Sequence, residues 1–89
     1  MAASFHVTVA LPGKVEYEGE AASLVVPAAL GYLGILAHHA PIVAGLTPGK
    51  ITLRDAAGKI TDFTLKSNGF LEFSGNKATL MLDSLELPA

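Results

Sequence analysis

The chain has 89 residues, 51% hydrophobic and only 16% charged, with a net charge of −2. This length predicts a single domain, residues 1–89, with one modest core, because a chain of this size buries roughly 60–65% of its unfolded surface. The few Lys and Arg residues are spread singly, so no basic stripe favours nucleic-acid binding. The absence of cysteine excludes disulfides, thiolate chemistry and Cys-ligated metals.

The composition is short of polar residues for an ordinary globular domain. Its mean hydropathy is +0.47, and its charged fraction lies below the usual value of about 25%. We therefore expect part of the apolar surface to rest against another protein. The N-terminal segment MAASFHVTVA lacks the basic region of a secretory signal, which predicts a cytoplasmic chain.

The first two predicted strands are FHVTVAL, residues 5–11, and KVEYEGE, residues 14–20. The first alternates apolar and polar residues, so one of its faces is apolar. In the second, we expect Val15 and Tyr17 to share one face, opposite the charged residues. Pro12-Gly13 between them predicts a turn.

The next segment carries no charge from residue 21 to residue 49, which is long enough for a membrane-spanning helix. Pro27 and Pro41, together with several glycines, oppose that helix because an interior proline costs about 3 kcal/mol. The run is therefore predicted to form three strands, ASLVVP, YLGIL and PIVAGL, and no transmembrane segment. Strands that are apolar on both faces need a second cover, which a loop of the chain or a partner protein would supply.

The last third of the chain predicts four more strands, ITLRD, ITDFTLK, FLEFS and KATLMLDS. Ile51, Leu53, Phe63 and Leu65 are expected to face inward. DAAGK and Gly75-Asn76 predict tight connections, and 67–69, Ser-Asn-Gly, predicts a turn or bulge because Asn and Gly tolerate positive φ.

About ten short strands spaced 8–12 residues apart are typical of an all-β fold. No segment has the apolar stripe of a helix longer than two turns. We therefore predict an antiparallel β-sandwich or a flattened β-barrel.

Few residues suggest chemistry. His38 and His39 are candidate metal ligands, but neighbours on a strand point to opposite faces and no acidic partner is close in sequence. A packed or interface role is the better interpretation. Gly31 and Gly34 have the spacing of a GxxG nucleic-acid loop without its helices or basic residues, and no G-x-S-x-G nucleophile motif occurs. We expect no catalytic residue, no cofactor and no metal.

The run GYLGILAHHAPIVAGLTPGKITL resembles the pattern G-E-[LF]-G-[IV]-x-P-G-H-A-P-[LIV]-[LIV]-T-x-[LI]-x-P-G of the epsilon subunit of F-type ATP synthase. KVEYEGEAASLVVP and SNGFLEFSGNKATLMLDS are similar to the flanking family patterns. The resemblance covers about residues 5 to 85.

This resemblance implies a flattened antiparallel β-sandwich of two five-stranded sheets and a role in a rotary machine. The family's N-terminal domain sits at the foot of the central stalk, binds the gamma subunit and the c-ring, and couples them during ATP synthesis. It is not an enzyme by itself. The implied location is peripheral, on the cytoplasmic face of the bacterial inner membrane.

The resemblance also implies two contact sets. The residues that match positions against gamma are Leu36, His39, Ala40, Pro41, Ile42, Val43 and Ala44. The residues that match the loop approaching the c-ring are Leu30, Gly31 and Tyr32. Gly34, Pro48, Gly49 and Gly69 are expected to shape the backbone.

Several positions depart from the family pattern. The loop that often reads S-E-G-E is Ala29-Leu30-Gly31-Tyr32, so we expect apolar or aromatic packing through Leu30 and Tyr32 in place of an electrostatic match to the ring. Ala37-His38 stands where the pattern has Pro-Gly, and Ala44 where it has threonine. The family's C-terminal helical hairpin has no counterpart here, and LELPA favours a naturally short form over a cut one.

Two other functions stay open from the sequence. The chain could be a β-sandwich that holds an apolar ligand under the 27–46 loops, or a peptide inserted in a membrane. The gene order and the proteins recovered with the chain would separate these alternatives.

Overall fold

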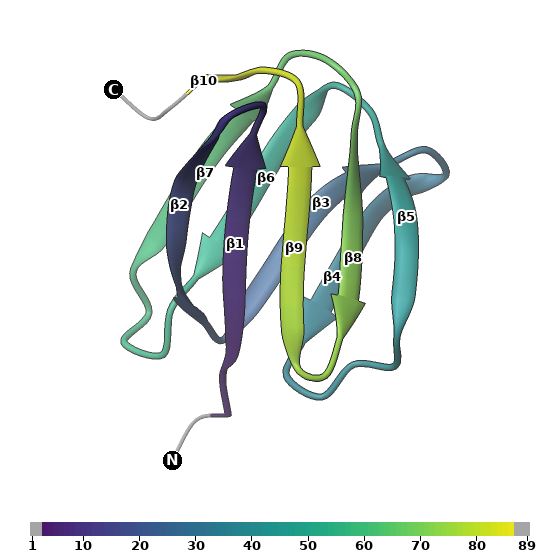
Figure 1. Ribbon diagram of the computed structural model, residues 1–89. Coiled ribbons are helices and arrows are strands. Elements are labelled where there is room, and N and C mark those ends of the chain that lie inside the picture. The colour runs from purple at the N-terminus through teal and green to yellow at the C-terminus, as the bar shows by residue number, and fades with distance from the viewer. Residues whose placement is uncertain (1–2, 87–89) are drawn as a thin grey trace.

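The computed structural model describes residues 3–86, which form ten strands and no helix (Figure 1). The strands are β1 (Phe5–Leu11), β2 (Lys14–Ala21), β3 (Ser23–Ala28), β4 (Gly31–Leu36), β5 (Ile42–Leu46), β6 (Gly49–Arg54), β7 (Ile60–Leu65), β8 (Gly69–Ser74), β9 (Lys77–Leu82) and β10 (Leu85–Glu86). The predicted all-β class is therefore confirmed. The last strand, β10, was not expected.

The strands form two layers of five (Figure 1). One layer has the order β5-β8-β9-β1-β2 and the other has β4-β3-β6-β7-β10. The layers are joined by one β3–β5 pair, Ala28 with Leu46, so the two predicted sheets share a hydrogen-bonded corner instead of being separate.

One pairing departs from the antiparallel prediction. β1 lies parallel to β9, with Val7 opposite Ala78 and Val9 opposite Leu80. Parallel neighbours need a long connection, and here nearly the whole chain provides it. β1 thus lies between β9, the last strand of the β8–β9 hairpin, and the edge strand β2.

The core lies between the two layers and contains apolar side chains from both. The residues predicted to face inward in β6 and β7 are all at most 3% exposed. Two aromatic pairs reinforce this packing: Phe5 and Phe73 meet edge-on with their ring centroids 5.5 Å apart. Tyr17 of β2 meets Phe63 of β7 at 5.6 Å, which connects the layers.

The uncharged run forms β3, β4 and β5, as predicted, rather than one long element. Within residues 3–86, no helix has the length and apolar character needed to cross a membrane. The three strands have alternate residues in the core, such as Leu24, Val26 and Ile35, and place the others outside.

The expected shared face of Val15 and Tyr17 is wrong. Tyr17 pairs with Val9 on the inner face, but Val15 pairs with Ala10 on the outer face and is 57% exposed. A bulge between these pairs places the extra residue, Glu16, in β2. Because one added residue reverses the alternation, the sequence period gave the wrong face.

The two predicted Gly-Asn and Asn-Gly turns have different geometry. Gly75 and Asn76 have φ of 55° and 57°, as a two-residue type I′ hairpin requires. At Ser67-Asn68-Gly69, no residue has positive φ, so that expectation is corrected. Gly69 is needed for space, since a Cβ there would lie 2.8 Å from the Met81 carbonyl oxygen.

Candidate protein-docking surface

The β3–β4 turn is the most exposed apolar feature among the described residues. Leu30 at its tip is fully exposed, at 103%. Gly31 follows with φ of 123°, a conformation that glycine adopts without a steric penalty. The turn therefore projects a leucine side chain into solvent with no charged residue beside it in sequence.

Tyr32 has a structural role as well as an exposed surface. Its side chain crosses the outer face of β3, and its hydroxyl accepts a hydrogen bond of 3.4 Å from the Lys50 backbone N–H. Pro27, its strand partner, is buried. A Cβ at Gly49 would lie 2.8 Å from the Pro27 Cβ and 3.1 Å from the Tyr32 hydroxyl, so Gly49 shapes this contact, as the sequence predicted.

In β5 the side chain of Val43 points outward, and the residues on either side of it are partly buried. Val43 is 70% exposed, whereas Ile42 and Ala44 are half-buried, and Ile42 packs against the core. Within this part of the predicted gamma-facing set, Val43 is therefore exposed to solvent, and Ile42 and Ala44 are partly covered by the chain itself.

The β3–β4 turn and β5 enclose an open groove of about 390 Å³. Its lining brings together one predicted set, Leu30, Gly31 and Tyr32, with part of the other, Ile42, Val43 and Ala44. Residues expected to meet two different partners are thus neighbours on one side of the molecule.

The remaining predicted contacts lie at the other end of β4 and in the following loop. Leu36 is 64% exposed, and Ala40 and Pro41 are exposed. His39 is half-buried, with its ring edge-on to Phe73 at 5.9 Å and its Nδ1 2.6 Å from the Ala40 carbonyl oxygen. This geometry agrees with the packed histidine that the sequence favoured.

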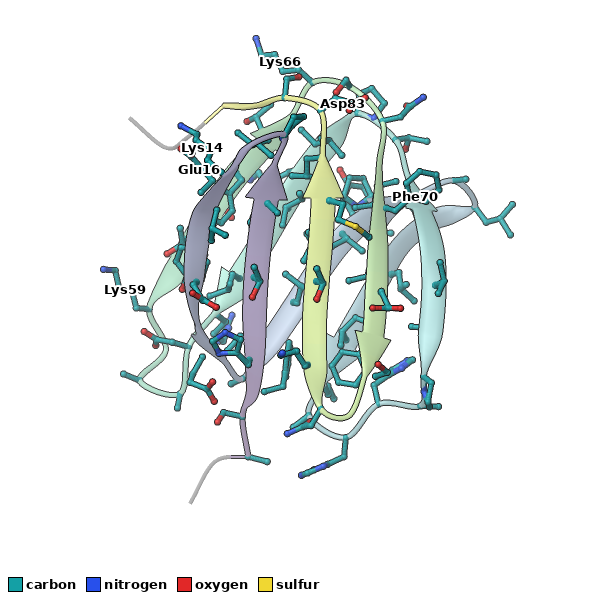
Figure 2. All side chains as sticks on the ribbon, viewed as in Figure 1. Lys14, Glu16, Lys59, Lys66, Phe70 and Asp83 are labelled. Atoms are coloured by element: carbon teal, nitrogen blue, oxygen red, sulfur yellow. The ribbon has the colours of Figure 1, made fainter. Side chains whose placement is uncertain are left out.

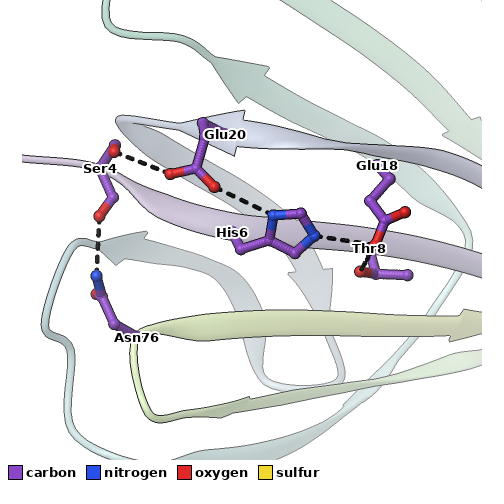
Figure 3. A network of polar contacts seen from close by, with 6 residues as sticks. All are labelled: Ser4, His6, Thr8, Glu18, Glu20 and Asn76. Atoms are coloured by element: carbon purple, nitrogen blue, oxygen red, sulfur yellow. Dashed lines mark hydrogen bonds and ion pairs between the residues drawn. The ribbon is translucent and has the colours of Figure 1, made fainter.

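His38 is held in an unusual backbone conformation at the position where the family pattern has glycine. Its φ is 64°, in the left-handed region that costs a non-glycine residue roughly 1–2 kcal/mol. The Asn76 side chain accepts the His38 N–H at 2.7 Å. It donates to the Ser4 carbonyl oxygen at 2.8 Å, a bond that Figure 3 shows. One amide thus ties the loop to the N-terminal strand.

A second apolar surface was missed by the sequence reasoning. Val15, Ala10, Met81 and Phe70 lie in register across β2, β1, β9 and β8 on the outer face. A shallow groove of about 350 Å³ lies beside Phe70 and Met81. The strand register brings these residues together, and no single strand shows that.

Several charged side chains lie away from the β3–β4 turn. In Figure 2, Lys14, Glu16 and Lys59 project from the opposite side of the molecule. Lys14 and Glu16 form an ion pair of 2.9 Å. β4 and β5 themselves carry no charged residue, and the exposed Glu72 of β8 lies opposite Val43.

His6 is the centre of a polar network on the outer face (Figure 3). Its Nε2 lies 3.0 Å from Glu18 and its Nδ1 lies 3.1 Å from Glu20. The hydrogen bonds that the His6 ring makes to Glu18, and then to Glu20, raise the pKa of His6, and His6 in turn lowers the pKa of Glu18. Within the described part of the chain, no three His, Asp or Glu side chains are grouped as metal ligands would be.

These features define a small β-sandwich whose uncharged, exposed side suits contact with other proteins. The chain belongs to the ATP synthase delta/epsilon chain family, and residues 4–88 match the model of that family's β-sandwich domain. The predicted family is therefore confirmed.

The curated relatives are ATP synthase epsilon chains. The chain is 36% identical to that of Halalkalibacterium halodurans over 86 residues, which is 97% of this chain and 63% of the relative. It is 38% identical to that of Leptospira borgpetersenii over 78 residues, 88% of this chain and 60% of the relative. The chain thus spans about 60% of the length of these two relatives. The Chlorobium limicola protein is 34% identical over 82 residues, and the match covers 92% of both chains.

Two solved assemblies contain a similar fold. One is the mitochondrial ATP synthase of Euglena gracilis, described as OSCP, F1 and c-ring, with a TM-score of 0.89, 20% identity, and coverage of 96% of this chain and 54% of that one. The other is the central stalk and c-ring of the Tetrahymena thermophila enzyme, with a TM-score of 0.75, 17% identity, and coverage of 90% and 63%. They establish a shared fold.

Proposed function

We propose that the chain is a central-stalk rotor subunit of a proton-translocating F-type ATP synthase that couples the c-ring to the gamma subunit. The observation that carries this proposal is the family membership of nearly the whole chain. The uncharged surface on the β3–β4 turn and β5 supports it, because an element that transmits torque needs an extensive contact with each partner. No bond chemistry is assigned to the chain itself.

The proposed contacts follow the two predicted sets. Leu30, Gly31 and Tyr32 approach the c-ring, with Leu30 as the leading apolar contact because it is fully exposed. The gamma-facing set is Leu36, His39, Ala40, Pro41, Ile42, Val43 and Ala44. Within it, Leu36 and Val43 offer the largest exposed apolar side chains, and His39 and Ile42 support the surface from below.

The proposed location is the cytoplasmic face of a bacterial inner membrane, reached through the complex. The bacterial relatives support this placement. Its partners are gamma and the c-ring, and no nucleic acid or cofactor takes part.

The test is recovery of the stalk from solubilised membranes with an affinity-tagged chain expressed in its own cells. The wild-type chain should retain both gamma and the c-ring. Val43→Glu should reduce recovered gamma at least tenfold, because a carboxylate would be desolvated in an apolar contact. Val15→Glu is the matched control, since Val15 is similarly exposed but lies on the opposite side, in β2.

Two further variants test the proposed contact with the c-ring. Leu30→Glu and Tyr32→Ala should reduce c-ring recovery and leave gamma bound. Unchanged ring recovery with both would contradict the assignment of the turn. A chain recovered with lipid but without either subunit would instead favour the apolar-ligand function, with the groove of about 390 Å³ as its site.

A further inference from the structure

The two layers end in edge strands of opposite character. Among the described strands, β2 pairs only with β1, and β4 pairs only with β3. β2 carries Lys and Glu residues and a bulge, devices that protect a sheet edge from unwanted pairing. β4, with the sequence GYLGIL, has no charge, no proline and no bulge.

The backbone groups on the open side of β4 can be identified from its pairing. The Pro27 carbonyl oxygen accepts the Thr47 N–H at 2.9 Å, on the side of β3 away from β4. A strand residue points its N–H and C=O to the same side, so Pro27 and its partner Tyr32 are a pair without hydrogen bonds between them. The backbone groups of Tyr32 therefore point outward, and by alternation those of Gly34 and Leu36 do too.

This edge offers a short ladder for another strand. Tyr32 and Gly34 present both N–H and C=O, and Leu36 presents its N–H, while its carbonyl oxygen already accepts the His39 N–H at 3.2 Å. Exposed apolar side chains flank the ladder, since Tyr32 and Leu36 are each 64% exposed.

We propose that two copies of this chain pair through β4, antiparallel about a two-fold axis at Gly34. The three outward-pointing residues are evenly spaced around Gly34, so Gly34 faces the same residue of the second copy, and Tyr32 faces its Leu36. In this register the outward N–H groups of Gly34 and Leu36 meet the Gly34 and Tyr32 carbonyl oxygens of the second copy. The Tyr32 N–H meets the Leu36 carbonyl oxygen, which also accepts the His39 N–H.

The edges also determine the size of the assembly. A two-fold contact uses the same patch twice and closes on itself. Continuation into a fibre would require β4 to pair with one of the other described edge strands, β2 or β10. The charged, bulged β2 opposes that contact, and β10 has only two residues. Two six-residue strands bury less than a standard interface of about 1,600 Å², so the dimer dissociates on dilution.

The dimer covers residues that the stalk assembly would use. Tyr32 and Leu36 belong to the proposed ring and gamma contacts, so the two associations compete. The dimer therefore shields the uncharged edge of chains that have not yet been assembled. The pairing itself depends on the geometry of β4 and not on the proposed function.

Sedimentation velocity of the purified chain over a wide concentration range tests the pairing. Gly34→Pro removes the central N–H without touching the β3–β4 ladder, because that N–H points outward. Gly34→Ala is the matched control that keeps it. Gly34→Ala fits, since Gly34 has no positive φ and a Cβ there meets nothing within 4 Å.

The wild-type chain and Gly34→Ala should change from monomer to dimer as concentration rises, and Gly34→Pro should require at least tenfold higher concentration. If Gly34→Pro does not fold, Gly34→Lys replaces it: two ammonium groups would face each other across the axis, and added salt should restore the dimer. A wild-type chain that stays monomeric at every concentration, or a folded Gly34→Pro or low-salt Gly34→Lys chain that dimerises as well as wild type, would overturn the proposal.

Discussion

At the scale of single residues, His6 shows how one side chain can connect two strands. Its neutral ring can donate to only one of Glu18 and Glu20, whereas the protonated ring donates to both. Lys77 of β9 lies opposite His6 on its other side, and Ser4 and Thr8 donate to the same carboxylates. The network fastens the edge strand β2 to β1.

This network predicts a pH-dependent contribution to stability. The folded-state pKa of His6 is raised above 6.5, so its contribution is complete below 6.5 and is lost as pH rises through the raised value. The pKa of Glu18 is lowered below 4.5, so its contribution is lost as pH falls through that lower value. The network therefore stabilises the fold most between these limits.

His6→Gln should consequently lower the melting temperature more at about pH 5.5 than at about pH 9. The effect should be small because the groups are exposed and screened by salt. Thermal unfolding of both chains at the two pH values measures it. An equal decrease at both would show that protonation of His6 makes no contribution.

Residue-scale features were also the hardest to predict from sequence. The left-handed backbone of His38 and its support by Asn76 join residues 38 positions apart, and no local pattern carries that information. The exposure of Leu30 and Val43 was expected from the family resemblance, but the hydrogen bond of Tyr32 to the Lys50 backbone was not. The contact roles of these residues stay predictions.

At the scale of elements, alternation of apolar and polar residues identified six of the ten strands, and the Pro and Gly residues of the uncharged run separated three more. Alternation gave the wrong result where a bulge interrupts the two-residue repeat of a strand, or where a strand is too short to show it. The bulge in β2 reversed the face of Val15, and the two residues of β10 are too few to show any alternation. The β1–β9 pairing was not predictable from either strand alone.

The junction of β8 with β9 depends on Gly69. A Cβ there would lie 2.5 Å from the Leu82 Cδ2 and 2.8 Å from the Met81 carbonyl oxygen. Because the second atom belongs to the backbone, the strands must separate to admit it. Gly69→Ala should lower the free energy of unfolding by about 1–3 kcal/mol, measured by denaturant titration.

Gly45 provides the matched control for this substitution. It lies in β5 opposite Phe70, and a Cβ there would meet nothing within 4 Å. Gly45→Ala should be neutral or stabilising by less than about 1 kcal/mol. Similar losses in both variants would mean that strand propensity, and not the close approach at Gly69, decides the effect.

At the scale of the whole molecule, the two layers form one structural unit. They share a single core, are bridged by the Tyr17–Phe63 contact and are joined at the Ala28–Leu46 corner. The sequence predicted two layers because most of its strands have one apolar face, but it gave no information on this corner. A shared core implies that neither sheet is stable without the other.

A substitution in one layer should therefore destabilise the other by the same amount. Ile51 of β6 is 1% exposed, and Ile51→Val should cost about 0.5–1.5 kcal/mol. Amide hydrogen exchange should show that loss equally for the slowest amides of β6 and of β9, which belongs to the opposite layer. Ile60→Val on β7 is the control, because Ile60 is 50% exposed and the change should stay within about 0.5 kcal/mol. If β9 amides kept their protection while those of β6 lost it, the layers would unfold independently, and the domain could not act as the rigid coupling element proposed for it.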